Sequence, residues 1–198
     1  CAFIAGLLAG LITGFLHTFL KIPAILAGIL TQLMLWSINL IVMNGKANLA
    51  LTRFKYGDKV LISAGTENIV MSLIILGAIV AVLIAVLYWF FGTELGMSLR
   101  STGNNLEMSR AQGINTSFTT VFGLALSNGV VAFAGSLLAQ QQGAADINMG
   151  RGAIVIGLAA VIIGEALFGK IFKNFALRLL SVAFGSIIYY IVIICHII

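Results

Sequence analysis

The sequence predicts an all-α fold, a polytopic membrane helix bundle with about six spans. Hydrophobic residues make up 61% of the 198 residues and charged residues only 9%, whereas about 25% are charged in a typical soluble domain. A spanning helix needs about 20 mainly apolar residues, because lipid cannot satisfy exposed backbone groups. Six runs reach or approach that length: 2–20, 23–43, 70–91, 117–139, 152–168 and 177–198. We therefore expect one transmembrane domain over residues 1–198. Because both ends lie inside apolar runs, we also expect a fragment that lacks both native ends.

The first two runs carry a packing signal. Gly6, Gly10 and Gly14 recur every four residues, which leaves one face of the first helix without side chains. Such faces let helices approach closely in lipid, so we expect a tight static contact, with a sliding contact as the alternative. Pro23 stands at the start of the second run, where its missing N–H costs nothing.

Two later runs differ in how well they suit a membrane. The run at 70–91 carries no charge and ends in four aromatic residues, Tyr88 to Phe91, which is typical of an interfacial belt. The run at 152–168 is short and carries Glu165, so a partly re-entrant segment is the alternative there. We expect Glu165 to be structural, within reach of Lys170 or headgroup water.

A polar island at 92–116 separates two of these runs. Asn104 and Asn105 suit a helix start, because their side-chain oxygens can accept the free N–H groups of a first turn. Gly113 suits a helix end, because it enters the left-handed conformation at little cost. The sequence predicts a helix of about two turns over 106–112. A helix this short is marginal in water, so we expect the bordering membrane or a partner protein to hold it.

The charge of the chain argues against nucleic-acid binding. The net charge of +5 is sparse and scattered, which fits anionic lipid headgroups and not the clustered basic face of a nucleic-acid-binding protein. Cys1 and Cys195 lie in apolar surroundings, and we expect two buried thiols that act as small hydrophobes, with a disulfide between them as the less favoured alternative. Positive residues divide six against five between the two sides, so charge does not decide the orientation.

The sequence predicts no catalytic residue, metal site or cofactor in this chain. His17 and His196 stand alone, without the spacing of a metal site, and we expect His17 to be a hydrogen-bonded structural residue. The stretch 164–170 has the spacing of a phosphate-binding loop, but Ile171 stands where Ser or Thr must hold magnesium.

Polar residues inside the runs are costly unless they face a partner or a cavity. Four of them are candidates for a solute path: Thr31, Asn39, Ser127 and Asn128. Asn128, beside Gly129 and near the middle of its run, is the strongest of these. Hydrogen bonding between helices is the alternative role.

The segment at 140–151 is too polar and glycine-rich to lie in lipid. It connects two runs on the side opposite to 92–116. A solvated turn is one interpretation, and a docking surface with Asp146, Asn148 and Arg151 as polar contacts is the other.

The stretch 99–116, LRSTGNNLEMSRAQGINT, resembles the cytoplasmic coupling loop of ABC importer permeases, in the branch that includes branched-chain amino acid and ribose permeases. Other stretches resemble one subgroup of that branch, often linked to tryptophan or tyrosine uptake: KIPAILAGIL, SINL, LSNG, ADINMG and IVIGLAAVIIGE. The resemblance covers nearly the whole chain.

This resemblance implies a multi-pass protein of the bacterial cell membrane, with 92–116 in the cytoplasm and 44–69 and 140–151 outside. It implies a separate ATPase that binds ATP and contacts the island, together with an external solute-binding protein and a second permease copy. The implied ATPase-coupling residues are Asn104, Asn105, Glu107, Met108, Arg110, Ala111 and Gly113.

Two other classes of function are alternatives to an ATP-driven importer for amino acids. An ion-gradient-driven secondary transporter or channel would need an ionisable chain or a broken-helix ion site inside the membrane, and Glu165 alone is thin support. A membrane scaffold without transport would explain the apolar runs but leave the island without a role.

Overall fold

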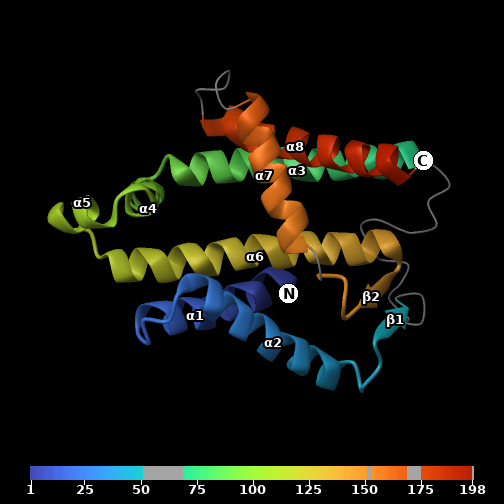
Figure 1. The fold of residues 1–198 in the computed structure, drawn as a ribbon, viewed down its shortest axis with the longest axis horizontal. Coiled ribbons are helices and arrows are strands. Elements are labelled where there is room, and N and C mark those ends of the chain that lie inside the picture. The colour runs from blue at the N-terminus through green and yellow to red at the C-terminus, as the bar shows by residue number, and fades with distance from the viewer. Residues whose placement is uncertain (51–68, 151–152, 169–174, 198) are drawn as a thin grey trace. The chain divides into compact units, whose positions relative to one another are not determined.

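The computed structural model describes residues 1–50, 69–150, 153–168 and 175–197 (Figure 1). The helices are α1 (Ala2–Thr18), α2 (Ala24–Val42), α3 (Ile69–Phe91), α4 (Glu94–Asn104), α5 (Leu106–Ala111), α6 (Thr116–Gln142), α7 (Ala153–Phe168) and α8 (Phe175–Ile197). Two short strands, β1 (Asn48–Ala50) and β2 (Ala144–Asp146), accompany them. The all-α membrane bundle is confirmed, and the strands are an addition that the sequence analysis missed.

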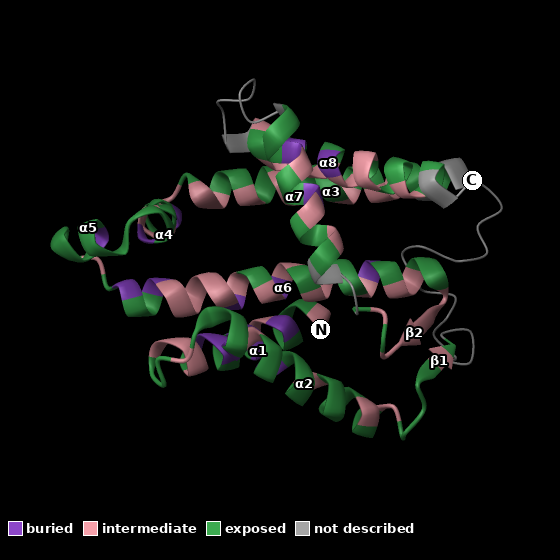
Figure 2. Ribbon diagram, viewed as in Figure 1, coloured by how far each residue is buried: buried purple, intermediate pink, exposed green. Residues whose placement is uncertain are grey.

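Six apolar helices correspond to the six predicted runs. Among the described residues, α2, α3, α6 and α8 are long and apolar enough to cross a membrane, while α1 and α7 are shorter apolar helices. Large apolar side chains are exposed along all six, and Figure 2 shows how few residues are buried. Surfaces of this kind are costly in water and suit lipid.

The chain divides into two compact units of contacts. One unit holds residues 1–72 and 91–147, and the other holds 73–90 and 148–198. We call the first the coupling unit, because it holds the island that the sequence analysis predicts to contact an ATPase, and the other the second unit, and we describe each by itself. The prediction of one domain over 1–198 stays a prediction.

The coupling unit is built on an antiparallel contact between α1 and α6. A methyl group added at Gly6 would lie 2.5 Å from the Ala132 Cβ atom, and one added at Gly10 would lie 2.5 Å from the Ala125 Cα atom. One added at Gly14 would lie 2.9 Å from the Cα atom of Val121. The predicted close approach of the glycine face is therefore confirmed, with α6 as its partner.

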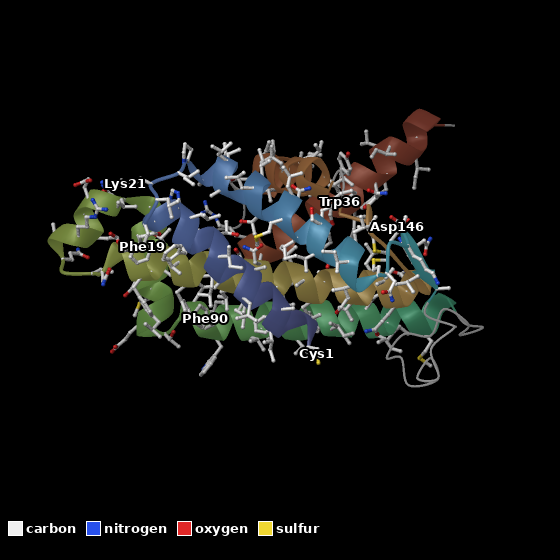
Figure 3. The ribbon with its side chains drawn as sticks, turned by 90° about the horizontal axis from the view of Figure 1, so that it is seen from below. Cys1, Phe19, Lys21, Trp36, Phe90 and Asp146 are labelled. Atoms are coloured by element: carbon white, nitrogen blue, oxygen red, sulfur yellow. The ribbon has the colours of Figure 1, made fainter. Side chains whose placement is uncertain are left out.

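Helix α2 returns alongside α1 after a short turn. The Thr13 hydroxyl lies 3.0 Å from the Thr31 hydroxyl, and both are buried. In the turn, the His17 Nδ1 atom lies 2.8 Å from the Ile22 carbonyl oxygen, as expected of a hydrogen-bonded structural histidine. Figure 3 shows Phe19 and Lys21 at this end of the unit and Asp146 at the other.

In the second unit, α7 and α8 cross at two glycines. A methyl group at Gly164 would collide with the Ser181 carbonyl group, and one at Gly185 would collide with the Ala160 carbonyl oxygen. Helix α7 is a regular helix from Ala153 to Phe168, so its described residues show no re-entrant break.

The expectation of buried thiols was wrong. Cys1 and Cys195 are both free and exposed. Each lies at an end of an apolar helix.

Candidate coupling site and solute path

The polar island folds into two helices, not the single one that the sequence predicts. Helix α4 is capped by Thr93, whose hydroxyl accepts a hydrogen bond from the Gly96 N–H at 3.3 Å. The buried side of α4 faces α6, where Leu99 lies beside Gly123. Asn104 is therefore the last residue of α4 and does not start a helix, which corrects the prediction for this residue.

Helix α5 has both of the predicted end signals. The Asn105 side chain accepts a hydrogen bond from the Met108 N–H at 3.0 Å. At the other end, Gly113 has a φ angle of 80°. The Gly113 N–H donates to the Arg110 carbonyl and the Ile114 N–H donates to the Ser109 carbonyl. These two bonds form a Schellman motif, which satisfies carbonyl groups at the helix end.

Helix α5 is anchored on its own chain, whereas the sequence analysis expected the membrane or a partner to hold it. Ser109 is 0% exposed, and its hydroxyl lies 2.9 Å from the hydroxyl of Ser101 on α4. The Arg110 Nε atom donates to the Thr116 hydroxyl, at the first residue of α6, over 3.0 Å. One buried serine and one arginine therefore fasten this two-turn helix to both of its neighbours.

The anchoring leaves one face of α5 open. Glu107, Met108 and Ala111 are exposed, and Met108 is 59% exposed although it is apolar. The Arg110 Nη1 atom lies 3.7 Å from Glu107 and stays partly exposed. Asn104, Asn105 and Gly113 are exposed beside this face. The island can thus present the exposed face of an anchored helix to a partner. The roles of these residues stay predictions.

The four candidate path residues do not converge on one spot. Asn128 and Ser127 both donate to the Leu124 carbonyl within α6, at 2.9 and 3.0 Å. The Asn128 Cβ atom lies close to Gly10 of α1, so its stem is part of the helix contact. Thr31 is buried against Thr13, and Asn39 is exposed on α2. Their roles in a solute path stay predictions.

The candidate docking segment is tied to a distant part of the chain. Strand β2 pairs in antiparallel register with β1, and Asp146 lies opposite Asn48. Asn148 is exposed just beyond the strand, and Arg151 lies outside the described residues. The contribution of 47–50 was missed, because a strand of three residues leaves no periodic signal in a sequence.

Within the described part of the chain, no three His, Cys, Asp or Glu residues gather as a metal site would require. The absence of a cofactor stays a prediction.

Comparisons with known proteins identify the family. The profile described as branched-chain amino acid transport system, permease component, matches residues 1–195. A tyrosine transport system permease protein of Clostridioides difficile is 41% identical over 188 residues, which are 95% of this chain and 60% of that protein.

Two further relatives are more distant. An uncharacterized protein of Rickettsia prowazekii is 34% identical over 191 residues, 96% of this chain and 65% of that protein. An autoinducer 2 import system permease protein of Yersinia pestis is 29% identical over 164 residues, 82% of this chain and 45% of that protein.

The chain thus spans less than two thirds of the length of these relatives. No solved structure matches the chain significantly. The family match and the apolar helices together make this a multi-pass protein of the bacterial inner membrane. With the profile matched over nearly its whole length, the chain belongs to the permease-component family of branched-chain amino acid transport systems.

Proposed function

We propose that this chain is the permease subunit of an ATP-driven ABC importer for amino acids, with aromatic amino acids favoured. The observation that carries the proposal is α5, a capped helix whose buried side is fixed by Ser109 and whose open face holds Glu107, Met108 and Ala111. A helix that is anchored on its buried side and exposed on its open face suits a protein contact that must transmit motion.

The partner at this face is a cytoplasmic ABC ATPase. ATP can bias the membrane helices only if the ATPase contacts α5 differently in its two states. Exposed Met108 supplies an adaptable apolar contact, and Glu107 beside Arg110 supplies a charged rim. The chain itself contributes the solute path and the coupling helix, with no catalytic step of its own.

The other partners follow from the same assembly. A solute-binding protein delivers the cargo at the end that carries the β1–β2 sheet, where Asp146 and Asn148 lie and Arg151 follows. A second permease copy completes the path, since closed two-fold pairs are the commonest assembly of identical chains. The choice of an aromatic cargo is supported by the 41% identical relative, a tyrosine transport system permease protein.

The test is uptake of radiolabelled tyrosine into proteoliposomes that hold the full-length permease, its ATPase and its solute-binding protein. We expect uptake that needs ATP on the ATPase side and survives ionophores. Uptake that runs on an ion gradient without ATP would identify a secondary transporter instead. ATP-driven uptake of another solute, with tyrosine excluded, would reject only the choice of cargo.

A further inference from the structure

The coupling unit contains a continuous line of contacts from α5 to the β1–β2 sheet. Arg110 of α5 donates to Thr116, the first residue of α6. Helix α6 then runs without interruption for 27 residues, a length of about 40 Å at the usual rise per residue. Only Gly143, with a φ angle of 66°, separates the end of α6 from β2. The sheet therefore lies at the opposite end of α6 from α5.

A second series of contacts, through α1 and α2, leads to the same sheet. Helix α2 is bonded to α1 through Thr31 and Thr13, and α1 is locked against α6 by its glycine face. Beyond α2, the turn at 43–47 leads into β1, and β1 pairs with β2. One further bond, from the Ile147 N–H to the Ala47 carbonyl at 3.0 Å, extends the ladder. Helix α1 is thus joined to α6 along its glycine face and to α2 through the threonine pair, and the sheet joins α2 to α6 at one end.

The helix contact in this unit leaves little room for sliding. Added methyl groups at Gly6 and Gly10 would meet backbone atoms of α6 at 2.5 Å, so the two backbones already touch. Tightly packed interfaces of this kind change between discrete arrangements and do not deform continuously. Close packing of this kind has low compressibility and transmits strain, so we expect α1 and α6 to move together.

We propose that α5, α6, α1, α2 and the β1–β2 sheet move as one rigid lever during transport, so that the sheet stays paired in every state. This inference rests on the proposed function, because it assigns the moving part of the importer. It adds that the outer sheet reports the position of the ATPase-facing helix. The loop at 44–50 thereby becomes part of the moving body and not a passive connection.

The strand register allows a cross-link that tests the lever. Since the Ile147 N–H bonds to Ala47, the pairs alternate so that Ala50 and Ala144 form a non-hydrogen-bonded pair. The Cα atoms of such a pair lie about 4.5 Å apart, which is within the range of a disulfide. We therefore choose the double variant Ala50→Cys, Ala144→Cys in the full-length permease, with Cys1 and Cys195 replaced by Ala. The single variant Ala50→Cys is the control for oxidation alone.

The lever predicts that the disulfide forms and that ATP-driven uptake is the same in the oxidised and the reduced protein. Loss of uptake on oxidation, restored by a reductant and absent in the single variant, would show that the sheet must open and would overturn the proposal. Failure of the two cysteines to cross-link would also overturn it, because the register would then be wrong. Absence of ATP-driven uptake in the reduced protein would instead contradict the proposed function.

A distance measurement gives a second, independent test. Spin labels at Gln112, beyond the end of α5, and at Ala144 report on the two ends of the lever. The lever predicts the same distance distribution without nucleotide and with the ATPase trapped in its ATP-bound state. A shift between the two states would show that the unit deforms.

Discussion

The hydroxyl of Ser109 on α5 lies 2.9 Å from the hydroxyl of Ser101 on α4. Ser109 also donates to the Asn105 carbonyl at 2.9 Å, so Ser101 is the donor in the pair. Because Ser109 is fully buried, this contact holds α5 in place without any partner protein. Helix α5 is therefore preorganised, which would lower the ordering cost of binding the proposed ATPase.

Removing the Ser101 hydroxyl should loosen α5 on α4. A net contribution of about 0.5–1.5 kcal/mol from the hydrogen bond predicts that Ser101→Ala weakens ATPase binding up to about tenfold. Titration of the purified permease in nanodiscs with its ATPase measures the affinity. Ser98→Ala is the matched control, because Ser98 donates only to the Glu94 carbonyl of its own helix. Equal affinities of the Ser101 and Ser98 variants would contradict this role.

The contact between α1 and α6 should tolerate no added bulk at Gly10. Gly10→Ala places a methyl group 2.5 Å from the Ala125 Cα atom, and overpacking of this kind costs about 1–3 kcal/mol. Gly135→Ala on α6 is the control, since nothing lies within 4 Å of the added group in the described structure. Unfolding in mixed detergent micelles should give a lower stability for the Gly10 variant alone. Two equally stable variants would show that the contact is loose.

Much of this architecture follows from the sequence, because apolar length and helix-end chemistry are local properties. The structure contains helices at the predicted apolar runs. It also shows the helix-end signals of Asn105 and Gly113 and the close approach at Gly6, Gly10 and Gly14. Helix α4 was missed because polar residues and glycines interrupt its apolar ones, and it packs against α6 through Leu99. The β1–β2 pairing was missed because it joins segments almost 100 residues apart, and no local pattern encodes such a contact.

The path prediction for Asn128 concerns transport and not folding. The Asn128 Nδ2 atom is satisfied by the Leu124 carbonyl within α6, so Asn128→Leu should cost at most about 1–2 kcal/mol of stability. We expect the same change to cut uptake strongly, because the amide oxygen is lost to a passing solute. Uptake is measured per folded complex, with Ser136→Leu on the same helix as control. Unchanged uptake would assign Asn128 to packing alone.

The proposed orientation, with α5 in the cytoplasm and the β1–β2 sheet outside, predicts which positions an external reagent reaches. Single cysteines at the exposed residues Gln112 and Asn148, in a background without Cys1 and Cys195, report the two sides. An impermeant thiol reagent on spheroplasts should label position 148 and leave position 112 unlabelled until the membrane is permeabilised. The reverse pattern would invert the orientation and remove α5 from the reach of an ATPase.

The most direct test of the coupling role is the recovery of the ATPase with a permease altered on the open face of α5. Ala111 is exposed there, and Ala111→Trp adds a large side chain at the contact without disturbing the buried Ser109. Asn148→Trp adds similar bulk at the opposite end of the coupling unit and is the control. We predict that Ala111→Trp abolishes co-purification of the ATPase while membrane insertion and the control stay normal. Full recovery of the ATPase with Ala111→Trp would contradict the assignment of α5 as the coupling helix.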